Sequence, residues 1–215
     1  MGQEFLKRII SSLILISIII FLITEGTVFL NLFILLCFLI SLYEWHRMKK
    51  DNIYYFTGII FLFLSFYSVF RFTNSEADYH YFIFILIICI STDFGGYIFG
   101  KIFKGKKLTK ISPNKTYSGM WGSFILSLVF SYLFLELTTI FPNLNFISIN
   151  TLIFILLISL ISQTGDIVIS YFKRKSKIKN TGNIIPGHGG LLDRIDGMIF
   201  AFPCGYLFLS FEILR

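Results

Sequence analysis

The sequence predicts an all-α integral membrane protein, a polytopic helical bundle of about seven transmembrane helices with a cytoplasmic N-terminus. Of its 215 residues, 55% are hydrophobic and only 14% are charged, and the mean hydropathy is +0.78. This composition lies well outside that of a soluble domain. Strand-like alternation of apolar and polar residues is absent, and backbone groups inside a bilayer must be satisfied within their own helix. A helical bundle is therefore the expected architecture.

Seven apolar runs supply the expected helices, and most are near the roughly 20 residues that a spanning helix needs. The first run could instead be a cleaved signal peptide, because Lys7 and Arg8 precede it. No small-x-small cleavage pattern follows at residues 24–26, so a helix is the preferred interpretation. In chain order, the runs cover residues 9–24, 28–45, 53–70, 79–100, 119–141, 147–172 and 197–214.

The distribution of Lys and Arg sets the orientation of these helices. With a cytoplasmic N-terminus, 17 of the 19 basic residues face the cytoplasm, and only Arg71 and Arg215 lie opposite. The formal net charge of +7 therefore belongs to one face of the membrane. The positive-inside rule explains this charge without a nucleic-acid partner, and none is expected.

The cytoplasmic loop at residues 100–118 holds six lysines and a Ser-Pro turn. Lysines and backbone amides in such a loop are suited to phosphate contacts. The alternative is a topogenic loop that only touches anionic headgroups.

Asp166 is an ionisable residue inside the sixth apolar run. It lies six residues before the end of this run, which at about 1.5 Å per residue is roughly 9 Å inside. A charge at that depth is costly and indicates a functional site. Ser170 and Lys173 follow at i+4 and i+7, so one helical face presents a carboxylate, a hydroxyl and an ammonium group toward the cytoplasm.

Residues 186–196 place a glycine-flanked histidine before two aspartates. Asp193 and Asp196 stand at i and i+3, so they can share a cation if the segment is helical. Together with Asp166 they favour a hard ion such as Mg²⁺, bound through oxygen, over zinc. The alternative is an Asp–Arg surface network that caps the last helix. His188 is a candidate general base, phosphate hydrogen-bond donor or turn residue; the donor role is preferred, because phosphates are already anionic near neutral pH.

Asp93 is a fourth carboxylate, near the cytoplasmic end of the fourth run, where Gly95 and Gly96 would allow close helix packing. The fourth and sixth helices run in the same direction, so Asp93 and Asp166 are expected at similar depths, as two walls of one polar cavity. The remaining acidic residues near span ends are expected to be reached by water or headgroups and are assigned no role; they are Glu25, Glu44, Glu136 and Glu212.

Two ordered motifs resemble those of the phosphatidate cytidylyltransferase family. The first reads Ser-Tyr-Phe-Lys-Arg over residues 170–174, then Lys179, then Pro-Gly-His-Gly-Gly-Leu-Leu-Asp-Arg-Ile-Asp over residues 186–196. The second reads Ile-Ser-Pro-Asn-Lys-Thr over residues 111–116. The region around Asp93 is similar to the family as well.

The resemblance implies an enzyme that transfers the cytidylyl group of CTP to phosphatidate and releases pyrophosphate, which leaves CDP-diacylglycerol in the membrane. The short chain indicates a bacterial inner membrane. The resemblance also implies a homodimer and a polar cavity that opens to the cytoplasm and to the lipid. Residues 1–215 would form a single membrane domain, with N-terminal helices in 1–78 and catalytic helices and loops in 79–215. By matching position, Asp166, Asp193 and Asp196 would hold Mg²⁺, with K⁺ as an additional candidate beside it. The other implied catalytic residues are Lys173 and His188, and the implied substrate- or phosphate-binding residues are Ser170, Arg174, Lys115, Thr116, Ser112, Arg194 and Asp93.

Three alternatives stay open at this point. A CTP-dependent polyprenol or dolichol kinase would also pair a cytidine nucleotide with a membrane lipid, but it would transfer the γ-phosphoryl group. An ion-coupled transporter could use Asp93 and Asp166 as a cation pathway, although no inverted repeat is evident. A CDP-alcohol phosphatidyltransferase is disfavoured, because the Asp-Gly-x-x-Ala-Arg run of that family is missing.

Overall fold

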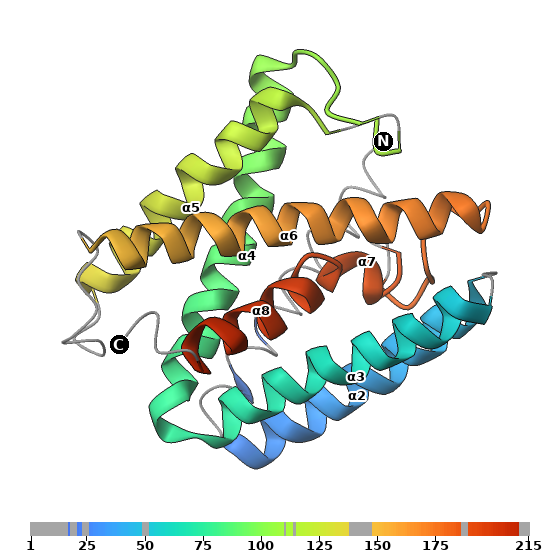
Figure 1. Ribbon diagram of the computed structural model, residues 1–215, viewed down its shortest axis with the longest axis horizontal. Coiled ribbons are helices and arrows are strands. Elements are labelled where there is room, and N and C mark those ends of the chain that lie inside the picture. Colours follow the sequence, from blue (N-terminus) through green and yellow to red (C-terminus); the bar gives the residue numbers. More distant parts are fainter. Residues whose placement is uncertain are drawn as a thin grey trace.

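The computed structural model describes residues 17, 21–22, 26–48, 52–109, 111–113, 115–137, 148–185 and 189–210 (Figure 1). Within these residues the chain forms seven helices and no strand beyond two isolated bridges. The helices are α2 (Thr27–Arg47), α3 (Asn52–Asn74), α4 (Glu76–Phe103), α5 (Tyr117–Leu137), α6 (Ile149–Lys175), α7 (Leu192–Ile195) and α8 (Met198–Ser210).

The helices α2 to α6 are long and apolar enough to cross a membrane, so the chain is a polytopic helical membrane protein. α8 is apolar but has only 13 residues. The predicted runs from 28–45 to 147–172 coincide with α2 to α6, apart from the end of the run 119–141, which lies outside the described residues. The predicted first helix, residues 9–24, also lies almost entirely outside them.

α2 and α3 form an antiparallel pair that lies side by side (Figure 1). At one end the Trp45 indole donates a hydrogen bond to the Tyr55 carbonyl, at 3.2 Å. At the other end the Asn31 amide donates to the Asn74 side chain, at 2.9 Å. Gly58 makes room for the indole, because a Cβ there would lie 1.9 Å from Trp45 Cζ2. The end of α2 that carries Trp45 is therefore held firmly against α3.

α4 and α5 approach each other through glycines. A Cβ at Gly95 would lie 2.3 Å from the Gly122 carbonyl oxygen, and a Cβ at Gly96 would lie 2.9 Å from Ser123 Oγ. The close packing predicted at Gly95 and Gly96 is therefore present. It brings the start of α5, and the loop before it, close to the polar end of α4.

α8 lies between α6 and α3 and packs its first turn against α6 (Figure 1). A Cβ at Gly197 would lie 2.4 Å from Ser162 Oγ, and a Cβ at Gly165 would lie 3.0 Å from the Asp196 carbonyl oxygen. These two glycines let the break between α7 and α8 approach α6 beside Asp166. Apolar packing holds this junction in place, through the buried cluster of Trp45, Met48, Leu62, Ile169, Leu192 and Ile199.

Candidate active site

A polar cavity of about 340 Å³ lies among α4, α5, α6, the loop before α5 and the α7–α8 junction. Its volume falls within the range of roughly 300–1,000 Å³ that is usual for small-ligand pockets. Asp93 and Asp166 both line it, as their matching depths predicted. Eight of the residues singled out in the sequence line this cavity: Asp93, Ser112, Lys115, Thr116, Asp166, Asp193, Arg194 and Asp196.

Lys115 crosses from the loop before α5 to α6. Its ammonium nitrogen lies 2.5 Å from Asp166 Oδ2 and 3.2 Å from the carbonyl oxygen of Gln163. The side chains of Lys115 and Asp166 are 24% and 27% exposed, so the pair faces the open cavity. Thr116 accepts a hydrogen bond from the Gly119 amide at 3.1 Å, which caps the start of α5 and fixes the loop. The loop before α5 and helix α6 thus bring the Lys115 ammonium and the Asp166 carboxylate together on one wall of the cavity.

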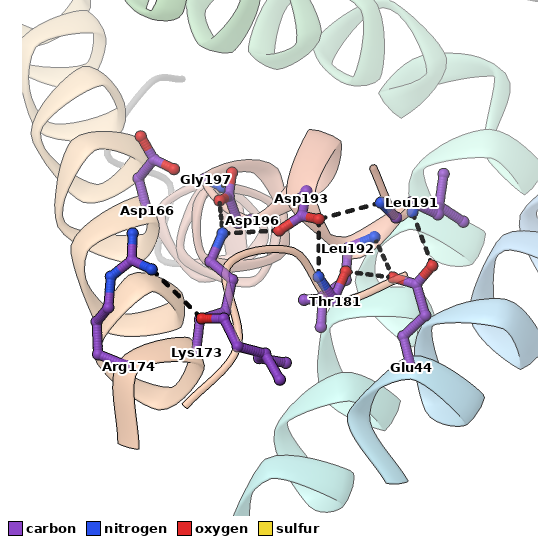
Figure 2. A network of polar contacts seen from close by, with 12 residues as sticks. Glu44, Asp166, Lys173, Arg174, Thr181, Leu191, Leu192, Asp193, Asp196 and Gly197 are labelled. Atoms are coloured by element: carbon purple, nitrogen blue, oxygen red, sulfur yellow. Dashed lines mark hydrogen bonds and ion pairs between the residues drawn. The ribbon is translucent and has the colours of Figure 1, made fainter. Parts of the chain in front are cut away.

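A second ion-pair group lies where α6 meets α7 (Figure 2). The Lys173 ammonium lies 2.7 Å from Asp193 Oδ1 and 3.7 Å from Asp196 Oδ2. Asp193 Oδ2 accepts from the backbone amides of Thr181 and Gly190, at 2.8 and 3.0 Å. Both carboxylate oxygens of Asp193 therefore have protein donors, and all three side chains of this group are at most 10% exposed.

Asp196 is a tightly enclosed carboxylate of the cavity wall, with a side chain 9% exposed. Burial raises the pKa of Asp196 well above its usual range, and the adjacent Asp166 carboxylate raises it further. The Lys173 ammonium lowers this pKa, but it does not offset the other two effects. Two neighbouring carboxylates in a poorly hydrated site favour either a shared proton or a bound cation.

Mg²⁺ binding by Asp166, Asp193 and Asp196 stays a prediction, against which the geometry of the three carboxylates can be considered. Within the described residues, no group of three or more His, Cys, Asp or Glu side chains is arranged to hold a metal ion. Asp166 and Asp196 lie together, whereas Asp193 is turned toward Lys173 and two amides. Mg²⁺ is commonly held by one or two carboxylates together with water and substrate phosphates, so Asp166 and Asp196 fit such an ion.

Three of the four remaining predicted site residues, all on α6, do not line the cavity. Lys173 is buried behind the α7 turn, and Ser170 lies half-buried one turn before it on α6. The Arg174 guanidinium donates to the Ile178 carbonyl at 3.3 Å and lines a separate shallow pocket. His188 lies outside the described residues.

The prediction that Glu44 is reached by water or headgroups is wrong. Glu44 is only 1% exposed. Its carboxylate accepts from the amides of Leu191 and Leu192, both at 2.9 Å, and from the Thr181 hydroxyl at 2.6 Å (Figure 2). These partners lie at least 137 residues away in the chain, and two of them are backbone groups. The only local signal was a carboxylate within an apolar run beside Trp45.

Comparison with known proteins shows which family and which named proteins this chain is similar to. The sequence model of the cytidylyltransferase family matches residues 50–212. A phosphatidate cytidylyltransferase of Rickettsia typhi is 35% identical over 211 residues, which is 94% of this chain and 90% of that protein. Another of Rickettsia felis is 36% identical over 214 residues with the same coverage. One of Staphylococcus saprophyticus is 41% identical over 132 residues, covering 61% of this chain and 49% of that protein.

Proposed function

The chain belongs to the cytidylyltransferase family, and from this premise we propose that its polar cavity is the active site of a phosphatidate cytidylyltransferase. As a nucleotidyltransferase of phospholipid biosynthesis, it converts CTP and phosphatidate into CDP-diacylglycerol and pyrophosphate. The observation that carries the assignment to the cavity is that eight of the predicted site residues line it, all within the segment that matches the family.

The reaction brings two polyanions together. A phosphate oxygen of phosphatidate attacks the α-phosphorus of CTP, a new P–O bond forms, and the bond to the β-phosphate oxygen breaks as pyrophosphate leaves. The attacking oxygen is already anionic near neutral pH, so no dedicated base is needed. The protein must therefore offset phosphate charge and hold the two phosphates in line.

Lys115 is suited to contact a substrate phosphate. An ammonium group has three N–H donors. Two of them are directed to Asp166 and to the Gln163 carbonyl, and the third remains for a phosphate oxygen in the cavity. Ser112, Thr116 and Arg194 line the same space and add donors for the triphosphate. Lys173 acts from behind the turn, where it holds Asp193 and Asp196 in place.

Asp166 and Asp196 would hold Mg²⁺, which supplies charge neutralisation at the reacting phosphates and at departing pyrophosphate. K⁺ remains an additional candidate in the same site. We assign Asp193 to the support of the α7 turn, because Lys173 and two backbone amides already engage its oxygens.

The protein would work in the inner membrane of a bacterium, because its relatives are bacterial and its spanning helices are numerous. The skewed distribution of basic residues supports a cavity that opens to the cytoplasm, where CTP is dissolved, while phosphatidate arrives from the bilayer. A homodimer follows from the family resemblance and is tested by the mass of the purified protein in detergent.

The decisive assay uses purified protein in mixed micelles with phosphatidate, Mg²⁺ and CTP labelled at the α-phosphate. Label should move into a CDP-lipid in the wild type, and Asp166→Asn and Asp196→Asn should abolish this transfer while the protein stays folded. An active preparation that leaves the lipid unlabelled would contradict the proposal. Transfer of label from the γ-phosphate to lipid would identify a lipid kinase instead.

A further inference from the structure

We propose that Glu44 is a positioning residue that fixes the α7 turn, and with it Asp196, against the cavity. The proposal rests on the function proposed for the cavity. Glu44 itself lies outside the cavity lining and belongs to α2, a helix that contributes none of the lining residues. Its action would therefore pass through the residues that it holds.

The contacts of Glu44 cover the start of α7. Oε1 accepts from the Leu191 amide, and Oε2 accepts from the Leu192 amide and the Thr181 hydroxyl. The first amides of a helix have no partner within the helix, so a carboxylate there satisfies donors that would otherwise be left unpaired. The two amides therefore stabilise the buried Glu44 carboxylate, and the carboxylate stabilises the start of α7.

Thr181 joins Glu44 to the carboxylates of the site. Its hydroxyl donates to Glu44 at 2.6 Å, while its amide donates to Asp193 at 2.8 Å. Asp193 in turn binds Lys173, whose ammonium also lies 3.7 Å from Asp196 (Figure 2). A continuous set of polar contacts thus runs from α2 to the cavity wall, and every side chain in it is buried or nearly so.

The space around Glu44 is fitted to a carboxylate. A Cβ at Gly190 would lie 2.5 Å from Oε2, and a Cβ at Gly182 would lie 2.6 Å from Oε1. Both glycines therefore allow the loop backbone to close around the side chain. Glutamine in place of Glu44 would retain one acceptor oxygen, but its NH₂ group would face a backbone N–H, so at least one amide would lose its partner.

The test compares purified Glu44→Gln with wild type and with Ser41→Ala as a matched control. Ser41 is equally buried on the same helix, but its hydroxyl donates to the Cys37 carbonyl of its own helix and, among the residues that the structure describes, to no other helix. Two quantities are measured for each protein: kcat and KM for CTP per folded molecule, and hydrogen exchange of the amides at residues 190–192. Exchange reports the positioning contact without depending on activity.

Glu44→Gln should lower kcat roughly tenfold, equivalent to about 1.4 kcal/mol, with KM for CTP changed far less, because Lys115 and Thr116 lie on another element. The amides of Leu191 and Leu192 should exchange roughly tenfold faster, whereas Ser41→Ala should match wild type in both respects. Wild-type kcat in Glu44→Gln would overturn the proposal. The proposal would also be overturned if the variant lost activity only in proportion to its loss of folded protein, and the amides at residues 190–192 exchanged as in wild type.

Thr181→Val keeps the proposal testable if Glu44→Gln does not fold. It removes the hydroxyl donor to Glu44 and keeps the amide that donates to Asp193. It should lower kcat in the same way but by less, and unchanged kcat and exchange would overturn the proposal. A wild type that makes no CDP-lipid would contradict the function proposed for the cavity, while the exchange measurement would still report whether Glu44 fixes the turn.

Discussion

Replacing Lys173 by Met removes the cation that lies between two carboxylates at the α6–α7 junction. Its ammonium is 2.7 Å from Asp193 and 3.7 Å from Asp196, and its side chain is only 10% exposed. Removing one partner of a buried ion pair costs about 3–5 kcal/mol. Asp193 keeps the amide donors of Thr181 and Gly190, so the lower end, about 3 kcal/mol, is expected.

At about 2–4 °C per kcal/mol for a chain of this size, the midpoint of thermal unfolding should fall by about 6–12 °C. Thermal unfolding in detergent, followed by tryptophan fluorescence, measures this shift, because the Trp45 ring packs against Phe172 one position before Lys173. Catalysis should fall as well, since the turn that carries Asp196 loses its support.

Lys175→Met serves as the control for this prediction. Lys175 lies two positions further along α6, is exposed, and places its ammonium 4.4 Å from the centre of the Tyr54 ring. Loss of such a surface cation–π contact costs about 0.5–1 kcal/mol. A difference of about 1 kcal/mol in stability corresponds to at least about 2 °C in the thermal midpoint. If the midpoints of Lys173→Met and Lys175→Met differ by less than about 2 °C, the ion pair does not support the turn and the reasoning is refuted.

Three further predictions address the cavity and the helix packing. Lys115→Met should raise KM for CTP by about tenfold or more but alter stability by less than about 1 kcal/mol, because its ion pair is partly exposed; unchanged steady-state kinetics would contradict the phosphate contact. Gly95→Ala should destabilise the protein by about 1–3 kcal/mol, because its Cβ would meet backbone at 2.3 Å, whereas Gly100→Ala, whose nearest atom is 3.2 Å away, should be milder in the same unfolding assay. The raised pKa of Asp196 means that the folded protein holds a proton that the unfolded chain releases, so this carboxyl lowers stability as pH rises above its ordinary pKa of 3.8. Asp196→Asn should therefore stabilise the metal-free protein at pH 7.5 and have little effect near pH 4, and equal shifts in thermal midpoint at both pH values would exclude this cause.

The sequence predicted the helices well because a membrane helix is determined largely by local composition. The runs 28–45 and 53–70 correspond to α2 and α3 because lipid requires a long apolar stretch at each span. The α7 turn was not predicted as a separate helix, because four residues carry no periodic signal. Its position depends on packing against distant residues.

The candidate site was predicted in part for a similar reason. Asp166 stood out because a charge inside an apolar run is visible in the sequence. Asp193 was grouped with Asp166 and Asp196 by residue type, but the structure gives it backbone amides as partners, and every residue except proline carries an amide. Glu44 was set aside because its position near a span end suggested hydration, and its partners lie in another part of the chain.

The contact between Glu44 and Leu191 also orders events during biosynthesis. The two residues are 147 positions apart, so at about 5–20 residues per second the ribosome reaches Leu191 about 7–30 s after Glu44. Throughout this interval, the Glu44 carboxylate lacks the two backbone amides from which it accepts in the folded protein. α2 can pair with α3 as soon as both helices have been made, but the contacts that hold Glu44 against the α7 turn can form only after residues 191 and 192 have been translated.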